Sequence, residues 1–199
     1  MQFRYEVARK LVHLSATFIV ILYSYTKDRM LTLYFVGFLL LIMLLMDFIR
    51  IEQQWPLPIV TRLYRKKETS RFGGNTSFAA STIITIALFD QVIACCTILL
   101  LIYGDTAASL IGRQFGQHKI KGTKNKSWEG TGAEFLIDWL ISNGFFFFMG
   151  LTLIEGLLLA TSMAFTATAI ETLVEELDDN LMIPPFTGTV GQLLRGVFG

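Results

Sequence analysis

Residues 30–49 read MLTLYFVGFLLLIMLLMDFI, twenty positions that carry one charged side chain, Asp47, near the end. A helix of twenty residues is about 30 Å long, which is the thickness of the hydrocarbon core of a bilayer. Charged residues stand on both sides of the run, with Lys27, Asp28 and Arg29 before it and Arg50 after it. The stretch therefore predicts a transmembrane helix with defined ends.

The rest of the chain repeats this pattern of apolar runs between short charged clusters. Its 199 residues are 53% hydrophobic and 17% charged, with a mean hydropathy of +0.53, whereas soluble domains have about 25% charged residues. This composition predicts an all-α, polytopic membrane helix bundle of about seven transmembrane helices, forming a single domain over residues 1–199 without a soluble domain. The expected spans are residues 11–25, 30–49, 76–89, 92–103, 131–149, 151–177 and a short last one within 180–199.

Seven spans put the amino-terminus and the segments 50–75, 104–130 and 171–180 on one side of the membrane. That side holds nearly all the Lys and Arg, and the positive-inside rule makes it cytoplasmic. On the other side we expect only the 27–29 cluster, Asp90 and uncharged turns. The first apolar run lacks a small-residue cleavage site, so we expect a retained helix rather than a signal peptide.

Two cysteines stand next to each other in the run 92–103, as Cys95 and Cys96. Adjacent residues on a helix point in different directions, so we expect two buried thiols rather than a disulfide or a metal pair. No nucleic-acid partner is expected. The sequence leaves the oligomeric state open.

A second stretch carries candidate chemistry, beginning with Gly104 and Asp105 directly after an apolar run. A carboxylate at membrane depth is costly and needs a partner or a water-filled site. On a helix Asp105, Ser109 and Gly112 share one face, and Gly112 and Gly116 have the small-residue spacing that permits close approach. Asp105 is therefore a candidate metal ligand, and the alternative is a helix-capping aspartate.

A basic loop follows, with five cationic residues within fourteen positions: Arg113, Lys119, Lys121, Lys124 and Lys126. Such a group can neutralise a polyphosphate, or it can serve only as the positive-inside signal. Glu129 then stands at a helix start, where it can hold a lysine or join a metal shell.

An acidic patch closes the 151–177 run. Glu171, Glu175 and Asp178 stand at i, i+4 and i+7, which predicts a carboxylate stripe on one helical face. Like charges at that spacing repel one another and oppose the helix dipole. We therefore expect a compensating divalent cation or the lysines of the basic loop, against the alternative of a solvated helix end. Asp179 and Asn180 follow, and both offer oxygen ligands suited to Mg²⁺.

Other polar residues remain open on residue type alone. Arg9 and His13 lie one turn apart on the first helix, but they and Lys10 are left unassigned by this reasoning. Glu134 and Asp138 lie inside an apolar run, where an ion pair of Glu134 with Arg71 or Lys126 is as good an explanation as a functional role. The chain has no P-loop, kinase glycine loop, GxSxG or HExxH motif, and a zinc site is improbable with two histidines.

In combination, these motifs resemble the CTP-dependent lipid-alcohol kinases, namely dolichol kinase, phytol kinase and the CTP-using diacylglycerol kinase. The matching pieces, in chain order, are Arg9-Lys10-x-x-His13, Gly73-x-Asn75-Thr76, Gly104-Asp105-x-x-Ala108, Gly112-Arg113-x-x-Gly116, Lys124-x-Lys126-Ser127-x-Glu129-Gly130-Thr131, Glu171, and Asp179-Asn180-Leu181-x-Ile183-Pro184. Two departures are Asn125, which separates two lysines that are adjacent in the family, and Asp138. The Gly-Asp and Lys-Ser-Trp-Glu-Gly segments are also similar to phosphatidate cytidylyltransferases.

The resemblance implies CTP as phosphate donor, Mg²⁺ as cofactor and a membrane lipid alcohol as acceptor: a polyprenol, a phytol-like isoprenoid or diacylglycerol. The implied catalytic residues are Asp105, His13, Lys126 and Glu129, and the implied metal ligands are Asp105, Glu171, Glu175, Asp179 and Asn180. The implied nucleotide and phosphate contacts are Arg9, Lys10, Asn75, Thr76, Gly104, Gly112, Arg113, Gly116, Lys124, Lys126 and Gly130. The alternatives are a CDP-lipid synthase, which would release pyrophosphate, and a non-enzymatic membrane transporter or scaffold.

Overall fold

The computed structural model describes residues 2–52, 72–123, 125–174 and 178–198. Within these ranges the chain is all-α, apart from one isolated antiparallel bridge between Lys119 and Ser127. Eight helices occur in the described part of the chain: α1 (Gln2–Ser15), α2 (Thr17–Thr26), α3 (Arg29–Glu52), α4 (Gly74–Leu88), α5 (Gln91–Phe115), α6 (Trp128–Phe148), α7 (Leu153–Leu173) and α8 (Asp179–Phe198).

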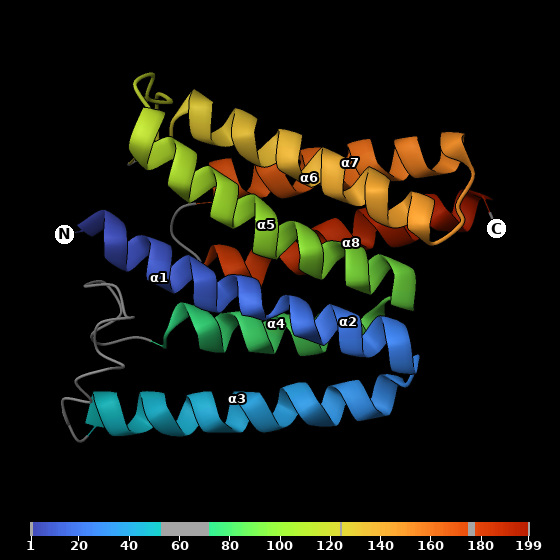
Figure 1. The fold of residues 1–199 in the computed structure, drawn as a ribbon, viewed down its shortest axis with the longest axis horizontal. Coiled ribbons are helices and arrows are strands. Elements are labelled where there is room, and N and C mark those ends of the chain that lie inside the picture. Colours follow the sequence, from blue (N-terminus) through green and yellow to red (C-terminus); the bar gives the residue numbers. More distant parts are fainter. Residues whose placement is uncertain (1, 53–71, 124, 175–177, 199) are drawn as a thin grey trace.

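The helices run side by side along one axis, so that their connections collect at the two ends of the bundle (Figure 1). α1 and α2 follow one another with a break at Ala16 and together form one rod. The polar end holds the start of α1, the described part of the 116–127 loop, the end of α7 and the start of α8. The opposite end holds the turns at 27–28, 89–90 and 149–152 and the carboxyl end of α8. Of the segments predicted to share one side, the amino-terminus and the described parts of 104–130 and 171–180 reach the polar end, whereas most of 50–75 lies outside the described residues.

α5 forms the centre of the bundle and packs against α1, α2, α4, α6, α7 and α8. Nearly every side chain from Ile93 to Ile102 is buried, which explains why this helix is apolar on all its faces. Cys95 and Cys96 lie in this core as free, buried thiols, so their predicted role as small hydrophobic residues is confirmed.

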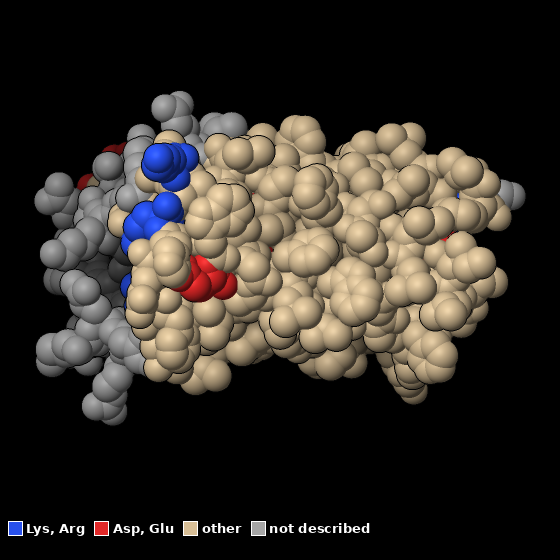
Figure 2. Space-filling model, turned by 90° about the horizontal axis from the view of Figure 1, so that it is seen from above, with Lys and Arg blue, Asp and Glu red and all other residues tan. Residues whose placement is uncertain are grey.

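α3 lies at the edge of the bundle and presents an apolar stripe to the outside. The exposed side chains at helical spacing are Leu31, Tyr34, Phe38, Leu41, Leu45 and Phe48. A soluble monomer rarely exposes a continuous apolar surface of this extent. On the face shown in Figure 2, the exposed charged side chains gather beside the polar end, and almost all of the remaining surface is uncharged.

Among the described residues, three helices are long and apolar enough to cross a membrane: α3, α5 and α7. Together with the exposed apolar stripe on α3, they support a membrane protein. The sequence-based count of about seven spans goes beyond these three.

Several helix boundaries differ from the prediction. The first helix begins at Gln2 rather than near Leu11, and α5 continues through Gly104 and Asp105 as far as Phe115. Asp105 therefore lies inside α5, ten residues before its last residue, so the interpretation of this residue as a helix cap is wrong. Small residues after position 104 did not end the helix, because they pack it closely against α6.

The acidic patch differs as well. α7 ends at Leu173, and Val174 has an extended backbone, because the chain must turn there to begin the antiparallel α8. Asp178 lies beyond that helix, so the predicted stripe of Glu171, Glu175 and Asp178 on one helical face is wrong; Glu175 itself lies outside the described residues. Asp178 instead accepts the backbone N–H of Asn180 (3.0 Å) at the start of α8.

The opposite end carries more charge than the expected 27–29 cluster and Asp90. Glu155 lies in the first turn of α7 and Arg195 in the last turn of α8. Glu155 belongs to a helix start, where the Thr152 hydroxyl accepts its backbone N–H (3.4 Å). We expected only uncharged turns on this side besides the 27–29 cluster and Asp90, and that expectation was wrong.

Asp47 joins the end of α3 to the start of α4. Its side chain is fully buried, and its two oxygens accept three hydrogen bonds: from Arg50 Nη2 (2.7 Å), from the Gly73 backbone N–H (2.9 Å) and from Thr76 Oγ1 (2.6 Å). A carboxylate can satisfy all three donors, whereas an amide offers one oxygen and turns an N–H group toward the remaining donors. This contact explains the one acid in the most apolar span.

Replacing Asp47 by asparagine is therefore expected to lower the free energy of unfolding by about 1–3 kcal/mol, the cost of leaving a buried hydrogen-bonding group unsatisfied. Denaturant unfolding of the purified protein in detergent micelles measures this difference. Asp90→Asn is the matched control, because Asp90 is exposed at the opposite end and accepts a bond from Gln192 Nε2 (2.8 Å). Equal stability of the two variants would contradict the role of Asp47.

Candidate functional site

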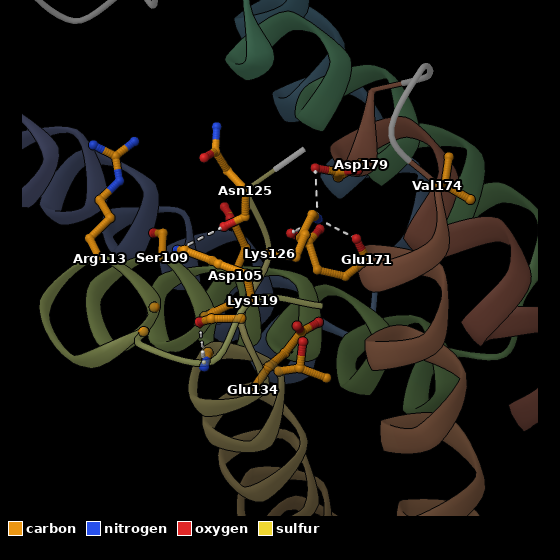
Figure 3. A pocket seen from close by; sticks show the side chains of 16 residues that line it. Asp105, Ser109, Arg113, Lys119, Asn125, Lys126, Glu134, Glu171, Val174 and Asp179 are labelled. Atoms are coloured by element: carbon orange, nitrogen blue, oxygen red, sulfur yellow. Dashed lines mark hydrogen bonds and ion pairs between the residues drawn. The ribbon is translucent and has the colours of Figure 1, made fainter. Parts of the chain in front are cut away.

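A cavity of about 600 Å³ opens at the polar end of the bundle. Its wall combines α5, the 116–127 loop, α6, the end of α7 and the start of α8 (Figure 3). The volume lies within the range of small-molecule sites. The lining residues are Asp105, Ala108, Ser109, Gly112, Arg113, Gly116, Lys119, Asn125, Lys126, Ser127, Gly130, Thr131, Glu134, Glu171, Val174 and Asp179.

Asp105 connects this cavity to the first helix. Lys10 Nζ lies 2.5 Å from Asp105 Oδ2 and also donates to the Asp105 backbone carbonyl (3.0 Å). His13 Nε2 lies 3.7 Å from the same carboxylate oxygen and 3.4 Å from the Leu101 carbonyl. Lys10 is almost fully buried, so removing the Asp105 carboxylate would leave a buried cation without this compensating charge. Lys10 and His13 of one motif thus form a cluster with Asp105 of another motif, which lies more than 90 positions further along the chain.

Lys126 makes the second ion-paired cluster. Its Nζ lies 2.6 Å from Glu171 Oε1 and 3.7 Å from Asp179 Oδ2, and it also donates to the Glu171 backbone carbonyl. Burial disfavours the ammonium ion, but the carboxylates of Glu171 and Asp179 outweigh burial and raise the pKa of Lys126. Of the two compensating groups expected for the acidic patch, the lysine is therefore present, and it comes from the predicted loop.

Glycines let α5 and α6 approach closely beside the cavity. A Cβ added at Gly130 would lie 2.9 Å from the Ala108 carbonyl oxygen and 3.1 Å from Gly112 Cα, both backbone atoms. A Cβ at Gly116 would meet the Gly112 carbonyl oxygen and Ser127 Oγ. These glycines keep the packing close, and because they also line the cavity, their predicted contact with phosphate stays a prediction.

Gly130→Ala is expected to destabilise the protein by about 1–3 kcal/mol, because backbone atoms of α5 must move to admit the methyl group. Gly132→Ala is the control on the same helix, since nothing lies within 4 Å of a Cβ there. Thermal unfolding of both variants in detergent should show a lower midpoint for Gly130→Ala alone. The same unfolding midpoint in both variants would mean that α5 and α6 can admit a methyl group at this contact without cost.

Gly104 is close to a buried acid that the sequence left unexplained. A Cβ at Gly104 would lie 2.5 Å from Asp138 Oδ1 and 2.8 Å from Oδ2. Asp138 is fully buried, and among the described residues neither carboxylate oxygen has a hydrogen-bond partner. Glycine at 104 therefore makes room for the Asp138 carboxylate next to Asp105.

Other predicted site residues lie outside the cavity lining. Thr76 is held by Asp47, and its neighbour Asn75 is half-buried at the start of α4. Asn180 Nδ2 donates to the Gly74 carbonyl (3.3 Å) and so ties α8 to α4. Arg9 precedes Lys10 on α1, and Lys124 lies outside the described residues.

Glu129 holds the 116–127 loop in place. Its Oε1 lies 2.6 Å from His118 Nδ1, and it accepts the His118 backbone N–H (3.1 Å). The hydrogen bond from His118 lowers the pKa of Glu129 to about 2. Since Glu129 is absent from the lining, its position indicates that it orders the loop that carries Lys126.

Ligands for a divalent cation are limited to a few oxygens. In the described ranges, no three side chains of His, Cys, Asp or Glu converge on a common metal position. Mg²⁺ at nucleotide sites needs only one or two carboxylates, because phosphates and waters complete its shell. Asp105 and Asp179 both line the cavity and Glu171 Oε2 has no partner among the described residues, so the donor set fits a cation that binds with a nucleotide.

The sequence reasoning missed or left open part of the wall. Lys119, Asn125 and Thr131 line the cavity, and so does Glu134, whose carboxylate in an apolar run was the available signal. Ser109 faces the cavity together with Asp105 and Gly112, as their shared helical face predicted.

Comparison with known proteins adds relatives of stated activity. The CTP-dependent diacylglycerol kinase 1 of Saccharomyces cerevisiae is 31% identical over 67% of the chain and 48% of that protein. A probable chloroplastic phytol kinase of Triticum aestivum is 29% identical over 69% of the chain and 48% of that protein. The CTP-dependent diacylglycerol kinase 1 of Schizosaccharomyces pombe is 28% identical over 91% of the chain and 89% of that protein.

The chain spans about half the length of the first two of these relatives and most of the third. No family profile and no solved structure matches it. The sequence similarity therefore comes from individual curated proteins, all of them named as lipid kinases.

Proposed function

We propose that the chain belongs to the CTP-dependent lipid kinase family and that it transfers the γ-phosphate of CTP to the hydroxyl of a membrane lipid alcohol. The observation that carries the proposal is the cavity at the polar end, in which three cations, Arg113, Lys119 and Lys126, face acids from α5, α7 and α8. A triphosphate needs this combination of neutralising cations and metal-binding oxygens.

We assign different roles to the cations and to the oxygen ligands of the site. Arg113 and Lys126 would offset the negative charge of the triphosphate, while Asp105 and Asp179, with Glu171 and Asn180, would hold Mg²⁺. When bound, Mg²⁺ supplies neutralisation of the charge on the phosphate oxygens. The assignment of all these metal ligands, and that of Glu175, stays a prediction.

The cluster on α1 would prepare the same site from its other side. Lys10 and His13, fixed by Asp105, would hold phosphate or orient the acceptor hydroxyl, and Arg9 would add charge beside them. In the transfer, the hydroxyl oxygen forms a bond to the γ-phosphorus. The bond from that phosphorus to the β–γ bridging oxygen breaks, CDP leaves, and the hydroxyl gives up its proton.

Membrane orientation follows from the same end of the bundle. We infer that α1 with α2 forms the first of seven spans, α3 to α8 the others, and that the polar end faces the cytoplasm, where CTP is available. The acceptor hydroxyl would reach the cavity from the inner leaflet with its tail in the bilayer. The exposed apolar surface of α3 supports this arrangement.

The test is transfer of label from [γ-³²P]CTP, with [γ-³²P]ATP in parallel, to a panel of polyprenol, phytol and diacylglycerol in detergent micelles. The expected products are CDP and a labelled lipid monophosphate. Pyrophosphate and a CDP-lipid would identify a cytidylyltransferase instead. If isothermal titration shows no Mg²⁺-dependent CTP binding, the result would favour the non-enzymatic alternative, a membrane transporter or scaffold.

A further inference from the structure

Glu134 is an acid in the cavity wall that none of the contacts above uses. It lies on α6, and its side chain is only 2% exposed. Its Oε2 atom has no hydrogen-bond partner among the described residues, although the residue lines the cavity. A buried carboxylate oxygen without a donor is costly, and most such atoms in proteins are satisfied by a side chain, water or ligand.

The sequence analysis named Lys126 and Arg71 as candidate ion-pair partners of Glu134, but neither gives Glu134 Oε2 a hydrogen bond among the described residues. The ion pairs of Lys126 go to Glu171 and Asp179, as the dashed lines in Figure 3 show, and Arg71 lies outside the described residues. Asp138, one turn further along α6, also lacks a donor among the described residues, but it is packed behind Gly104 and does not line the cavity. Of these two acids, Glu134 alone belongs to the cavity lining.

The position of Glu134 along α6 indicates which of the two substrates it would contact. It lies six residues into α6, about 9 Å along the helix from the loop that carries Lys119 and Lys126. The triphosphate would occupy the cationic loop side, while an acceptor anchored in the bilayer would arrive from farther along the helices. A carboxylate accepts hydrogen bonds and repels phosphate, so the fitting group is an O–H donor.

We propose that Glu134 binds the acceptor hydroxyl and takes up its proton, an inference that rests on the proposed lipid kinase function. As the hydroxyl oxygen bonds to the γ-phosphorus and CDP leaves with the bridging oxygen, the O–H proton passes to Glu134 Oε2. The proton later returns to water through the cavity mouth. Glu134 is then the catalytic residue that distinguishes a hydroxyl from other groups reaching the site.

The Glu134→Gln variant tests this assignment. Its kcat is compared with that of the wild type, using CTP, Mg²⁺ and the lipid alcohol that the wild type phosphorylates. Loss of a general base is expected to lower kcat by about 10²-fold or more, with the dissociation constant for CTP within threefold of wild type. Asp138→Asn is the matched control, a buried acid of the same helix outside the lining, and its kcat should stay within about threefold. Glu134→Asp, which keeps a carboxylate, should recover part of the lost kcat.

The outcomes separate this proposal from the function on which it rests. A wild-type protein that phosphorylates no lipid alcohol overturns the proposed function. An active wild type together with a Glu134→Gln kcat within threefold of it overturns the assignment of Glu134 alone. If Glu134→Gln fails to fold, Glu134→Asp decides: at least tenfold lower kcat with normal CTP binding supports the assignment, and wild-type kcat overturns it.

Discussion

Asp105→Asn is expected to lower the rate of CTP-dependent lipid phosphorylation by about 10²–10³-fold, the loss typical of removing one charged group that stabilises a transition state. The substitution keeps the shape of the side chain but removes the charge that pairs with Lys10 and faces His13. It also removes a proposed metal ligand. Initial rates with labelled CTP at saturating lipid measure the effect.

Two measurements keep this result from being mistaken for unfolding. Asp105→Asn should migrate as wild type in size-exclusion chromatography, because neighbouring α5 residues that fill the core are unchanged. Asp90→Asn, at the opposite end of the bundle, should keep full activity. Full activity of Asp105→Asn would remove both the metal role and the charge-pairing role of this residue.

Much of the fold was accessible from local patterns. The apolar run 30–49 predicted α3, and charged or glycine-containing turns predicted where most helices meet. Hydropathy could not find the break at Ala16 or the end of α7 at Leu173, because both depend on how neighbouring helices pack. Asp105 shows the same limit: a local reading allows a cap or a ligand, and only the packing of α5 against α1 places Lys10 beside it.

The residues of the candidate site were likewise predictable from the sequence, but their contacts with one another were not. The family resemblance implied that Asp105, Lys126, Glu171 and Asp179 belong to one site, and all four line one cavity. The choice between a cation and a lysine as partner of the acids depends on distances across the bundle, which no spacing encodes. Glu134 was ambiguous for the same reason, since its proposed role follows from where Lys126 points.

Lys126→Met is expected to weaken CTP binding by about 10- to 100-fold, since a hydrogen bond to a charged group contributes about 1.5–3 kcal/mol. The methionine keeps most of the side-chain length and removes the charge. Isothermal titration of CTP in the presence of Mg²⁺ measures the change. Lys121→Met, exposed in the same loop and absent from the cavity lining, should bind CTP as wild type does.

Lys126 has two possible uses, because its ammonium pairs with Glu171 in the structure and would contact phosphate in the complex. A double-mutant cycle with Glu171→Gln separates them. If Lys126 only balances the acid, then removing both charges restores CTP affinity to that of Glu171→Gln. If it binds phosphate, the double variant stays about tenfold or more weaker than Glu171→Gln. We expect the second result, because Lys126 lines the cavity together with Arg113 and Lys119, and three cations in one wall suit a triphosphate.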